Sequence, residues 1–422
     1  MTRVIHTADT HIGYRQYHSP ERRQDFLDAF EAVVSDAIEA DVDAVVHAGD
    51  LFHDTRPDLG DLMGTIRILR RLADADIPFL GIVGNHERTR DRQWMDLIAD
   101  LDLAERLDAS GTPIGDVTFY GLDWVPPAQR DRLEYRFDQP DTDAAALVAH
   151  GLFEPFAHAN WDTEALLEAA TIDFDALLLG DNHIPDRAEV NETWVTYAGS
   201  TERASASERT ERGYNLVTFD ESIRISRRTI EGTRSFVFVD VTLEGNEGID
   251  RIREHVLERP IEDAVVIVTI EGDGTDVSPA AVEETARDAG ALVVRVNDTR
   301  ERDDVDERPT VQFSDPDQAI EAELEALGMS PVGHMVDGIV RDATIPDSGV
   351  RERVRSRIET LLDQEPEAFV GVAEPESSSG HPEEPGEATD EQVPSDAGTE
   401  DDESDETDRE ASTDGQLSIG EF

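Results

Sequence analysis

Short apolar runs alternate with amphipathic segments in the first half of the chain. Between residues 21 and 40 the apolar side chains recur every three or four residues, so they share one face of a helix. Apolar runs at 4–8 and 43–48 flank this helix, and each has the length of a buried strand. The order repeats with a helical segment at 59–72 and a run at 78–83. Because strand, helix and strand in succession call for a buried sheet with helices on its faces, we predict an α/β fold.

Later apolar runs divide the chain into further parts. A first domain with the bounds 1–230 is completed by runs at 117–121, 144–149, 176–179 and 194–198. A small, separate α/β domain is expected at 231–308. Its predicted elements are strands at 236–243, 264–270 and 291–296 and helices at 249–257 and 279–289.

The last part of the chain changes character twice. Residues 309–366 have helical spacing interrupted by the turn-forming segment Pro346-Asp347-Ser348-Gly349, which predicts a helical hairpin. Residues 367–422 consist mainly of Glu, Asp, Ser, Pro and Gly and hold almost no large apolar side chains before the last few positions. Because such a segment cannot bury enough apolar surface to offset the entropy lost on folding, we predict a disordered acidic tail.

The charge balance bears on the protein's environment. The chain has 96 acidic residues against 37 basic ones, all of them Arg, and a formal net charge of -59. In dilute buffer this charge makes the folded state repel itself, whereas molar salt shortens the Debye length to about 3 Å and screens the repulsion. We infer a salt-adapted cytoplasm, where the usual argument that acidic proteins avoid nucleic acids is weak.

Cysteine, membrane and export signals are all missing from the sequence. Without cysteine there are no disulfides or thiolate ligands, so any metal must be held by His, Asp, Glu or Asn. No apolar run approaches the length of about 18 residues that a membrane span needs, and the N-terminus lacks the regions of a secretory signal. We expect a soluble, cytoplasmic protein.

Five polar clusters follow directly after apolar runs. They are Asp9-Thr10-His11, Gly49-Asp50 with His53, Gly84-Asn85-His86-Glu87, His150-Gly151 and Gly180-Asp181-Asn182-His183. Each alone has an ordinary explanation: an Asp-x-His pair suits an acidic loop, a Gly-Asn pair suits a turn, and a histidine can end a buried strand. In open α/β sheets, however, residues just beyond the carboxyl ends of strands converge on one crevice. The conjunction of all five therefore favours one shared site.

The convergent side chains suit a metal centre. A mixed oxygen and nitrogen set suits manganese, iron or zinc, and it can fill two sites if one carboxylate bridges them. Two ions about 3.5 to 4 Å apart activate water, neutralise phosphoryl oxygens and align the attacking and leaving groups, as phosphoester hydrolysis requires. Glycine before Asp50, Asn85 and Asp181 permits a tight turn and a close approach of the backbone. The candidate ligands are Asp9, His11, Asp50, Asn85, His150, Asp181 and His183.

The clusters resemble the motifs of the calcineurin-like metallophosphoesterase superfamily, which run Asp-x-His, Gly-Asp, Gly-Asn-His-Glu/Asp, His and Gly-His-x-His. The resemblance covers roughly residues 1–230 and implies a β-sandwich flanked by helices. Within the superfamily, the segments 8–14, 49–54 and 198–203 resemble the archaeal meiotic-recombination-eleven nuclease family, which is related to the bacterial SbcCD nuclease. The small domain and the helical hairpin fit the capping domain and the partner-binding helices of that family.

The resemblance also implies how the ligands are shared between two metals. One metal would be held by Asp9, His11, Asp50 and His183, and the other by Asp50, Asn85, His150 and the residue at 181. The departure is Asp181, because the family pattern has histidine there. An anionic oxygen favours hard cations and makes bound water less acidic, so we expect an active but retuned second site.

The activity implied by the resemblance is that of a DNA nuclease with two Mn2+ per subunit. It would be a 3'-5' exonuclease on double strands and an endonuclease on single strands, in double-strand-break repair at the nucleoid. His86 would stabilise the transition state or protonate the leaving oxygen, as an imidazole titrating near neutrality can, and His53 would orient the phosphate.

The implied partners begin with DNA and a coiled-coil ABC-type ATPase, which would bind the helical region near 330–362. Helices at 58–72 and 91–101 would form a homodimer within a heterotetramer. At the C-terminus, Gln416, an aliphatic residue three positions on and Phe422 resemble a sliding-clamp-binding peptide that lacks its second aromatic residue. A short apolar end of this kind also arises by chance.

Two other functions are compatible with the same motifs. Fold and metals alone do not select a substrate, so a small-molecule phosphodiesterase or nucleotidase is the first alternative. A nucleotidase, however, has little need of a cap, a hairpin and a long tail. The second alternative is a repair scaffold in which Asp181 has weakened the nuclease, and the otherwise intact ligand set argues against it.

Overall fold

The computed structural model describes residues 1–130, 132–275 and 277–300. It also describes the residue pairs 332–333, 335–336, 354–355, 357–358 and 417–418. Apart from these pairs, the predicted helical hairpin at 309–366 and the predicted acidic tail at 367–422 lie outside the described residues. None of the helices in the described part of the chain has the length and apolar character that a bilayer span requires.

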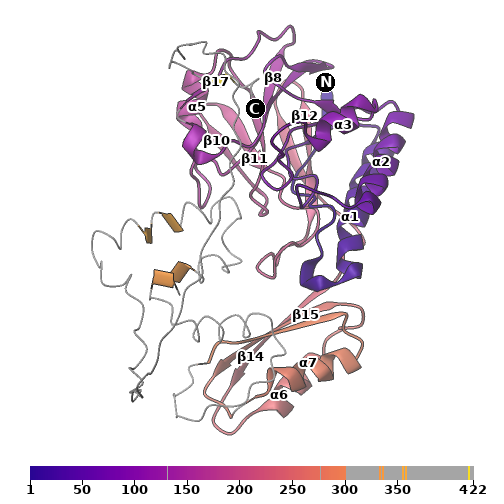
Figure 1. Cartoon of the computed structure of the whole chain (residues 1–422), viewed down its shortest axis with the longest axis vertical. Coiled ribbons are helices and arrows are strands. Elements are labelled where there is room, and N and C mark those ends of the chain that lie inside the picture. The colour runs from indigo at the N-terminus through magenta and orange to yellow at the C-terminus, as the bar shows by residue number, and fades with distance from the viewer. Residues whose placement is uncertain are drawn as a thin grey trace, which may run out of the picture.

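Two six-stranded sheets make up the larger part of the fold (Figure 1). The first has the order β13-β12-β1-β2-β3-β4 and the second the order β10-β11-β9-β8-β6-β5. The strands of the first sheet are β1 (Thr2–Thr7), β2 (Ala44–His47), β3 (Phe79–Gly81), β4 (Glu105–Arg106), β12 (Gly213–Phe219) and β13 (Arg224–Thr229). Those of the second are β5 (Thr112–Ile114), β6 (Val117–Leu122), β8 (Ala144–His150), β9 (Ala176–Gly180), β10 (Asp186–Val190) and β11 (Thr193–Tyr197).

The central strands of both sheets are parallel and buried on both faces. In the first sheet β1, β2 and β3 pair in parallel, with β4 parallel to β3 at the edge, and in the second β6, β8, β9 and β11 pair in parallel. Side chains alternate between the faces of a strand, so Val4 of β1 packs into the layer between the sheets while Ile5 packs under the helices. The continuous apolar runs in the sequence follow from this double burial.

Helices cover the outer faces of the sandwich. The first sheet is covered by α1 (Pro20–Ala40), α2 (Leu59–Asp74) and α3 (Trp94–Asp100), whose apolar sides share one core with it. The second packs against α5 (Thr163–Ala169). Shorter elements are η1 (Gln16–His18), α4 (Pro127–Arg130), β7 (Leu133–Glu134) and β17 (Leu417–Ser418), the last paired in parallel with β7. The predicted helix-flanked β-sandwich is thus confirmed.

A smaller α/β unit follows the sandwich and has a parallel three-stranded sheet. Its strands are β14 (Phe236–Leu243), β15 (Val265–Gly272) and β16 (Val293–Asp298), and its helices are α6 (Ile249–Leu257) and α7 (Pro279–Asp288). Both helices pack on one face of the sheet around Ile252 and Val282. On the other face, Ile267 packs near Tyr17 of the larger unit.

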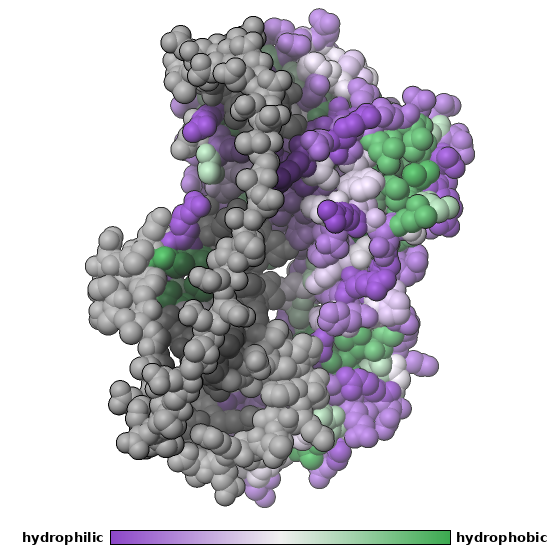
Figure 2. Space-filling view, viewed as in Figure 1, coloured by the Kyte–Doolittle hydropathy of each residue, from purple (hydrophilic) through white to green (hydrophobic). Residues whose placement is uncertain are grey.

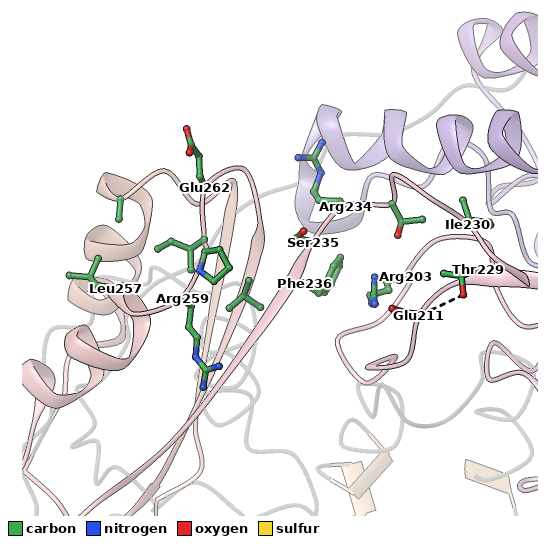
Figure 3. A pocket seen from close by; sticks show the side chains of 15 residues that line it. Arg203, Glu211, Thr229, Ile230, Arg234, Ser235, Phe236, Leu257, Arg259 and Glu262 are labelled. Carbon is green, nitrogen blue, oxygen red and sulfur yellow. Dashed lines mark hydrogen bonds between the residues drawn. The ribbon is translucent and has the colours of Figure 1, made fainter.

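Arginines join the two units. Arg234, in the connecting segment, places Nη2 2.8 Å from Oδ1 of Asp25 on α1 and Nη1 2.7 Å from Oδ1 of Asp263 in the smaller unit. The ring of Phe236 lies under the guanidinium group of Arg203, 5.3 Å from its centroid. Beside these contacts is a cavity of about 780 Å³, lined by both units, with Arg259 among its lining residues (Figure 3).

Candidate metal centre

All five sequence clusters lie at the carboxyl ends of strands. Asp9 and His11 follow β1, Asp50 follows β2, and Asn85 and His86 follow β3 in the first sheet. In the second sheet His150 is the last residue of β8, and Asp181 and His183 follow β9. The backbone N–H of Asp181 donates to Oδ1 of Asp9 over 2.9 Å, which joins the two sheets at this edge. The sandwich therefore brings residues from both halves together.

The backbone at this edge is strained at four candidate ligands. The φ angle is positive at Asp9 (51°), His11 (43°), Asp50 (57°) and Asp181 (89°). A residue other than glycine in this region costs on the order of 1 kcal/mol or more and persists only where the surroundings enforce it. Such strain clusters at functional sites. Here the strained backbone lies just beyond the ends of β1, β2 and β9, where it carries four candidate ligands.

Glycines next to the candidate ligands allow a close approach of the backbone. A Cβ atom at Gly84 would lie 2.0 Å from Oδ1 of Asp50. At Gly49, where φ is +88°, a Cβ atom would lie 2.6 Å from Nδ1 of His150. Larger residues at these positions would displace the side chains that converge here.

The first group of candidate ligands consists of Asp9, His11 and His183, whose ligand atoms lie within 4.8 Å of one another. The Nε2 atoms of His11 and His183 are 3.0 Å apart. Oδ2 of Asp9 is buried and has no hydrogen-bond partner among the described residues. A buried carboxylate oxygen beside two imidazole nitrogens is a donor set that suits a divalent cation.

The second group consists of Asp9, Asp50 and His150, and their ligand atoms also lie within 4.8 Å of one another. Nε2 of His150 lies 2.9 Å from Oδ1 of Asn85 and 3.4 Å from Oδ2 of Asp50. Oδ1 of Asp181 is 4.0 Å from the same nitrogen, and the Asp181 side chain is buried. The residue that departs from the family pattern thus lies beside the second group.

The charges at this edge are unbalanced toward the negative. Burial raises the pKa of Asp9 to about 6. Burial lowers the pKa of His150, but Asp50 and Asp181 outweigh it and raise that pKa to about 10. The pKa of His150 is raised because the surrounding carboxylates carry excess negative charge. Divalent cations would neutralise that charge, so the described residues fit such ions.

Burial acts differently on two other members of the cluster. Burial alone would raise the pKa of Asp50, but His150 and His86 outweigh it and hold that pKa below its usual value. Burial lowers the pKa of His11 well below its usual value. An ionised Asp50 and a neutral His11 are the protonation states that metal ligands need.

Three aromatic rings are stacked beside the two groups. The ring of His53 stacks on Tyr14, with centroids 4.0 Å apart, and on His86, with centroids 4.9 Å apart. Nδ1 of His86 lies 2.9 Å from the backbone carbonyl of His53, so this nitrogen carries the proton and donates it. The backbone N–H of His86 donates to Oδ1 of Asp50 over 3.0 Å, which places the His86 ring directly at the cluster.

Two supporting carboxylates were not predicted from the sequence. Glu87 accepts hydrogen bonds from the backbone N–H groups of Phe52 and Gly84, and burial raises its pKa to about 7. Glu208 lies behind His183, with Oε1 2.8 Å from Nδ1 of that histidine. Glu87 lies inside a quoted motif, whereas Glu208 is in a Ser-rich segment that carries no signal of its own.

Comparisons with known proteins agree with this geometry. The calcineurin-like phosphoesterase family model matches residues 2–185. DNA double-strand break repair protein Mre11 of Haloferax volcanii is 60% identical over 381 residues, which are 90% of this chain and 86% of the relative. The protein of the same name from Halobacterium salinarum is 56% identical over 374 residues, which are 87% of this chain and 96% of the relative.

The fold and the cluster define a metal-dependent phosphodiesterase of the calcineurin-like class. Within that class, the chain belongs to the Mre11 family of DNA double-strand break repair proteins. Both relatives come from haloarchaea, which confirms the salt adaptation that we inferred from the net charge.

Proposed function

We propose that this protein is a manganese-dependent nuclease with two Mn2+ per subunit. It cuts double-stranded DNA as a 3'-5' exonuclease and single-stranded DNA as an endonuclease, at double-strand breaks in the nucleoid. The observation that carries the proposal is the convergence of two metal-ligand groups that share Asp9, with the His86 ring beside them. Two ions at such a site supply charge neutralisation and an activated water for phosphodiester hydrolysis.

Two adjoining sites would each hold one ion. The ligands of the first would be Asp9, His11, Asp50 and His183, and those of the second would be Asp50, Asn85, His150 and Asp181, so Asp50 would belong to both sets. The burial of Asp50 between histidines of both groups supports this assignment. Its Oδ2 is 3.9 Å from Nε2 of His11 and 3.4 Å from Nε2 of His150.

His86 and His53 act on the phosphodiester. Because Nδ1 of His86 donates to a backbone carbonyl, its Nε2 is the atom that exchanges a proton with the leaving oxygen. His53 is held between Tyr14 and His86 and orients the phosphate. His53 also lines a cavity of about 260 Å³ whose lining includes Arg15 and Arg56, cations that suit the neighbouring backbone phosphates, together with three aspartates, one of which lies 3.8 Å from Arg15.

The proposed homodimer uses an apolar surface on α2 and α3. Leu59 and Met63 on α2 are 71% and 60% exposed, and Leu97 of α3 and the adjoining Leu101 are 37% and 43% exposed. Figure 2 shows apolar side chains gathered on the face of the molecule where these helices lie. Exposed apolar patches on a highly charged protein mark sites of association.

Two further partners are proposed from segments that lie, apart from a few described residue pairs, outside the described residues. The helical region near 330–362 binds the coiled-coil ABC-type ATPase, so that two nuclease and two ATPase subunits form a heterotetramer. The peptide at 416–422 binds a sliding clamp. Deleting 415–422 should abolish capture of the protein by immobilised clamp, and capture that persists would contradict this part of the proposal.

The nuclease is tested with end-labelled duplex and hairpin DNA in molar salt with manganese, magnesium or chelator. Wild-type protein should cut with manganese, and Asp50→Ala and His86→Ala should not. Asp250→Ala is the control, because the Asp250 side chain is 96% exposed on α6. A folded wild-type protein that hydrolyses only small phosphodiesters, or nothing, would refute the proposal.

A further inference from the structure

The buried carboxylate of Glu208 contacts Nδ1 of His183, whereas Nε2 of the same ring faces His11. We propose that Glu208 is a positioning residue, which fixes the tautomer and the orientation of His183 so that Nε2 of that histidine presents its lone pair to the metal. This inference rests on the proposed function, because it takes His183 to be a metal ligand. It assigns Glu208 no contact with substrate.

The contacts of Glu208 leave it little freedom. Its side chain is 4% exposed, and Oε1 lies 2.8 Å from Nδ1 of His183. The other oxygen, Oε2, accepts hydrogen bonds from Oγ of Ser200 (2.9 Å), Nη1 of Arg212 (2.9 Å) and the backbone N–H of Ala204 (3.2 Å). The three donors on Oε2 fix the carboxylate in place, and Oε1 faces the imidazole of His183.

Arg212 ties this carboxylate to the backbone of the histidine. The Arg212 side chain is fully buried, and its Nη1 donates both to Oε2 of Glu208 and to the carbonyl oxygen of His183, the latter over 3.0 Å. The backbone N–H of Ser200 donates to the same carbonyl over 3.2 Å. His183 is therefore hydrogen-bonded at its ring by Glu208 and at its backbone carbonyl by Arg212, and these two residues also form an ion pair with each other.

The arrangement decides which nitrogen of His183 carries the proton. Oε2 of Glu208 accepts hydrogen bonds from three donors, one of them the Arg212 guanidinium group at 2.9 Å, and these surroundings suit a carboxylate anion. An anionic carboxylate only accepts hydrogen bonds, which puts the proton on Nδ1 and leaves the lone pair on Nε2. That Nε2 lies 3.0 Å from Nε2 of His11, inside the first ligand group. A carboxylate behind a metal-binding histidine also makes the ring more basic.

A purely structural role is the competing explanation, and the chain offers a matched control for it. Glu202 lies in the same loop and is fully buried. Its Oε1 accepts from Nη2 of Arg22 (3.2 Å) and from the backbone N–H of Arg203 (2.7 Å), neither of which is a candidate ligand. Glu202→Gln and Glu208→Gln therefore each weaken one buried ion pair, but only Glu208→Gln changes the partner of His183.

The deciding experiment is calorimetric titration of Mn2+ into the full-length wild type and both variants in molar salt. Glu208→Gln should weaken one of the two binding events by about 10- to 100-fold, and Glu208→Asp should restore part of the loss. Glu202→Gln should stay within about twofold of wild type. Equal losses in both glutamine variants would overturn the inference, whereas a wild type that binds no Mn2+ would overturn the proposed function.

If Glu208→Gln fails to fold, the tautomer itself is measured in the wild type. Long-range 1H–15N spectra of labelled histidine rings, assigned with His183→Gln, should show the proton of His183 on Nδ1, both without metal and with Zn2+. A proton on Nε2 of the metal-free protein would overturn the inference. This readout depends on neither catalysis nor the identity of the native metal.

Discussion

The Nε2 atoms of His11 and His183 lie 3.0 Å apart although 172 residues separate the two histidines. Burial lowers the pKa of His11 well below its usual value, so the His11 ring is neutral. With the proton of His183 on Nδ1, as proposed above, Nε2 of His183 offers a lone pair across this gap. When the proton of the neutral His11 ring is on Nδ1, both Nε2 atoms offer lone pairs, and a divalent cation could accept the two together.

Divalent cations should therefore stabilise the fold. Because they bind the folded state and not the separated ligands, Mn2+ at a hundred times its dissociation constant should add about 2.7 kcal/mol per occupied site to the free energy of unfolding. Denaturant unfolding at constant molar salt, with Mn2+ or with chelator, measures this difference. His11→Gln should lose the contribution of the site to which His11 belongs, whereas the exposed-site variant Asp250→Ala should retain the whole gain. Equal stability with Mn2+ and chelator would contradict the assignment.

Asp181→His should change which metal the second group prefers. Replacing an anionic oxygen by a neutral nitrogen removes charge that favours hard cations, so the affinity for Zn2+ should rise relative to that for Mn2+. Competition titrations of the two metals measure the ratio. Asp186→His, at an exposed position in β10, is the matched control and should leave the ratio unchanged. An unchanged ratio for Asp181→His would show that Asp181 is not a ligand.

Gly84→Ala should inactivate the protein. The new Cβ would lie 2.0 Å from Oδ1 and 2.3 Å from the backbone nitrogen of Asp50, so the proposed bridging carboxylate and the backbone beside it must both shift. Displacements near 1 Å at a reacting centre can cost about 100-fold, so we expect at least that loss in cleavage rate. Gly60→Ala is the control, because nothing lies within 4 Å of a Cβ there, and this helical site should gain up to about 1 kcal/mol in stability. Full activity in Gly84→Ala would argue against a bridging role for Asp50.

His6 should make the fold sensitive to acid. Burial lowers the pKa of His6 from 6.5 to about 3, so the folded state stays neutral where the unfolded state binds a proton. The unfolded state thus binds more protons between pH 6.5 and about 3, and stability must fall as the pH falls through this window. The limiting slope is about 1.4 kcal/mol per pH unit for this group.

Urea titrations at several pH values compare wild type with His6→Leu. The variant should show a shallower loss of stability toward acid, and His255→Leu, at a partly exposed site on α6, should keep the wild-type slope. Part of the acid sensitivity should remain in His6→Leu, because burial also lowers the pKa of His47 to about 3. Parallel curves for wild type and His6→Leu would refute the prediction.

A charge in the apolar surface on α2 should separate the proposed dimer. Met63→Asp places an anion where one subunit would bury Met63 against the other, and an unpaired buried charge costs several kcal/mol. Light scattering during gel filtration in molar salt should give the mass of one chain for this variant and of two for wild type. Leu257→Asp, a similar change at a 55% exposed leucine on α6, should leave the mass unchanged. A wild type with the mass of one chain would remove the dimer from the proposal.

Much of the architecture followed from the apolar pattern. Strand β14 (Phe236–Leu243) and helix α6 (Ile249–Leu257) have the bounds that the pattern predicted. Strand β13 (Arg224–Thr229) was not predicted, because its sequence RISRRT alternates weakly and is largely basic. It forms because β12 offers an edge with which it can pair. A pattern read over a few neighbouring residues does not show that this edge is available.

The sequence by itself determined the donor types of the candidate centre and their places at strand ends, because both depend on residues within a few positions of each other. Only the tertiary structure decided that His11 meets His183 and that Asn85 meets His150, because these contacts require two sheets to pack face to face. The contact between Glu208 and His183 was also decided only by the tertiary structure. It arises where Arg212 and Ser200 place the carboxylate, and no periodicity in the chain encodes that position.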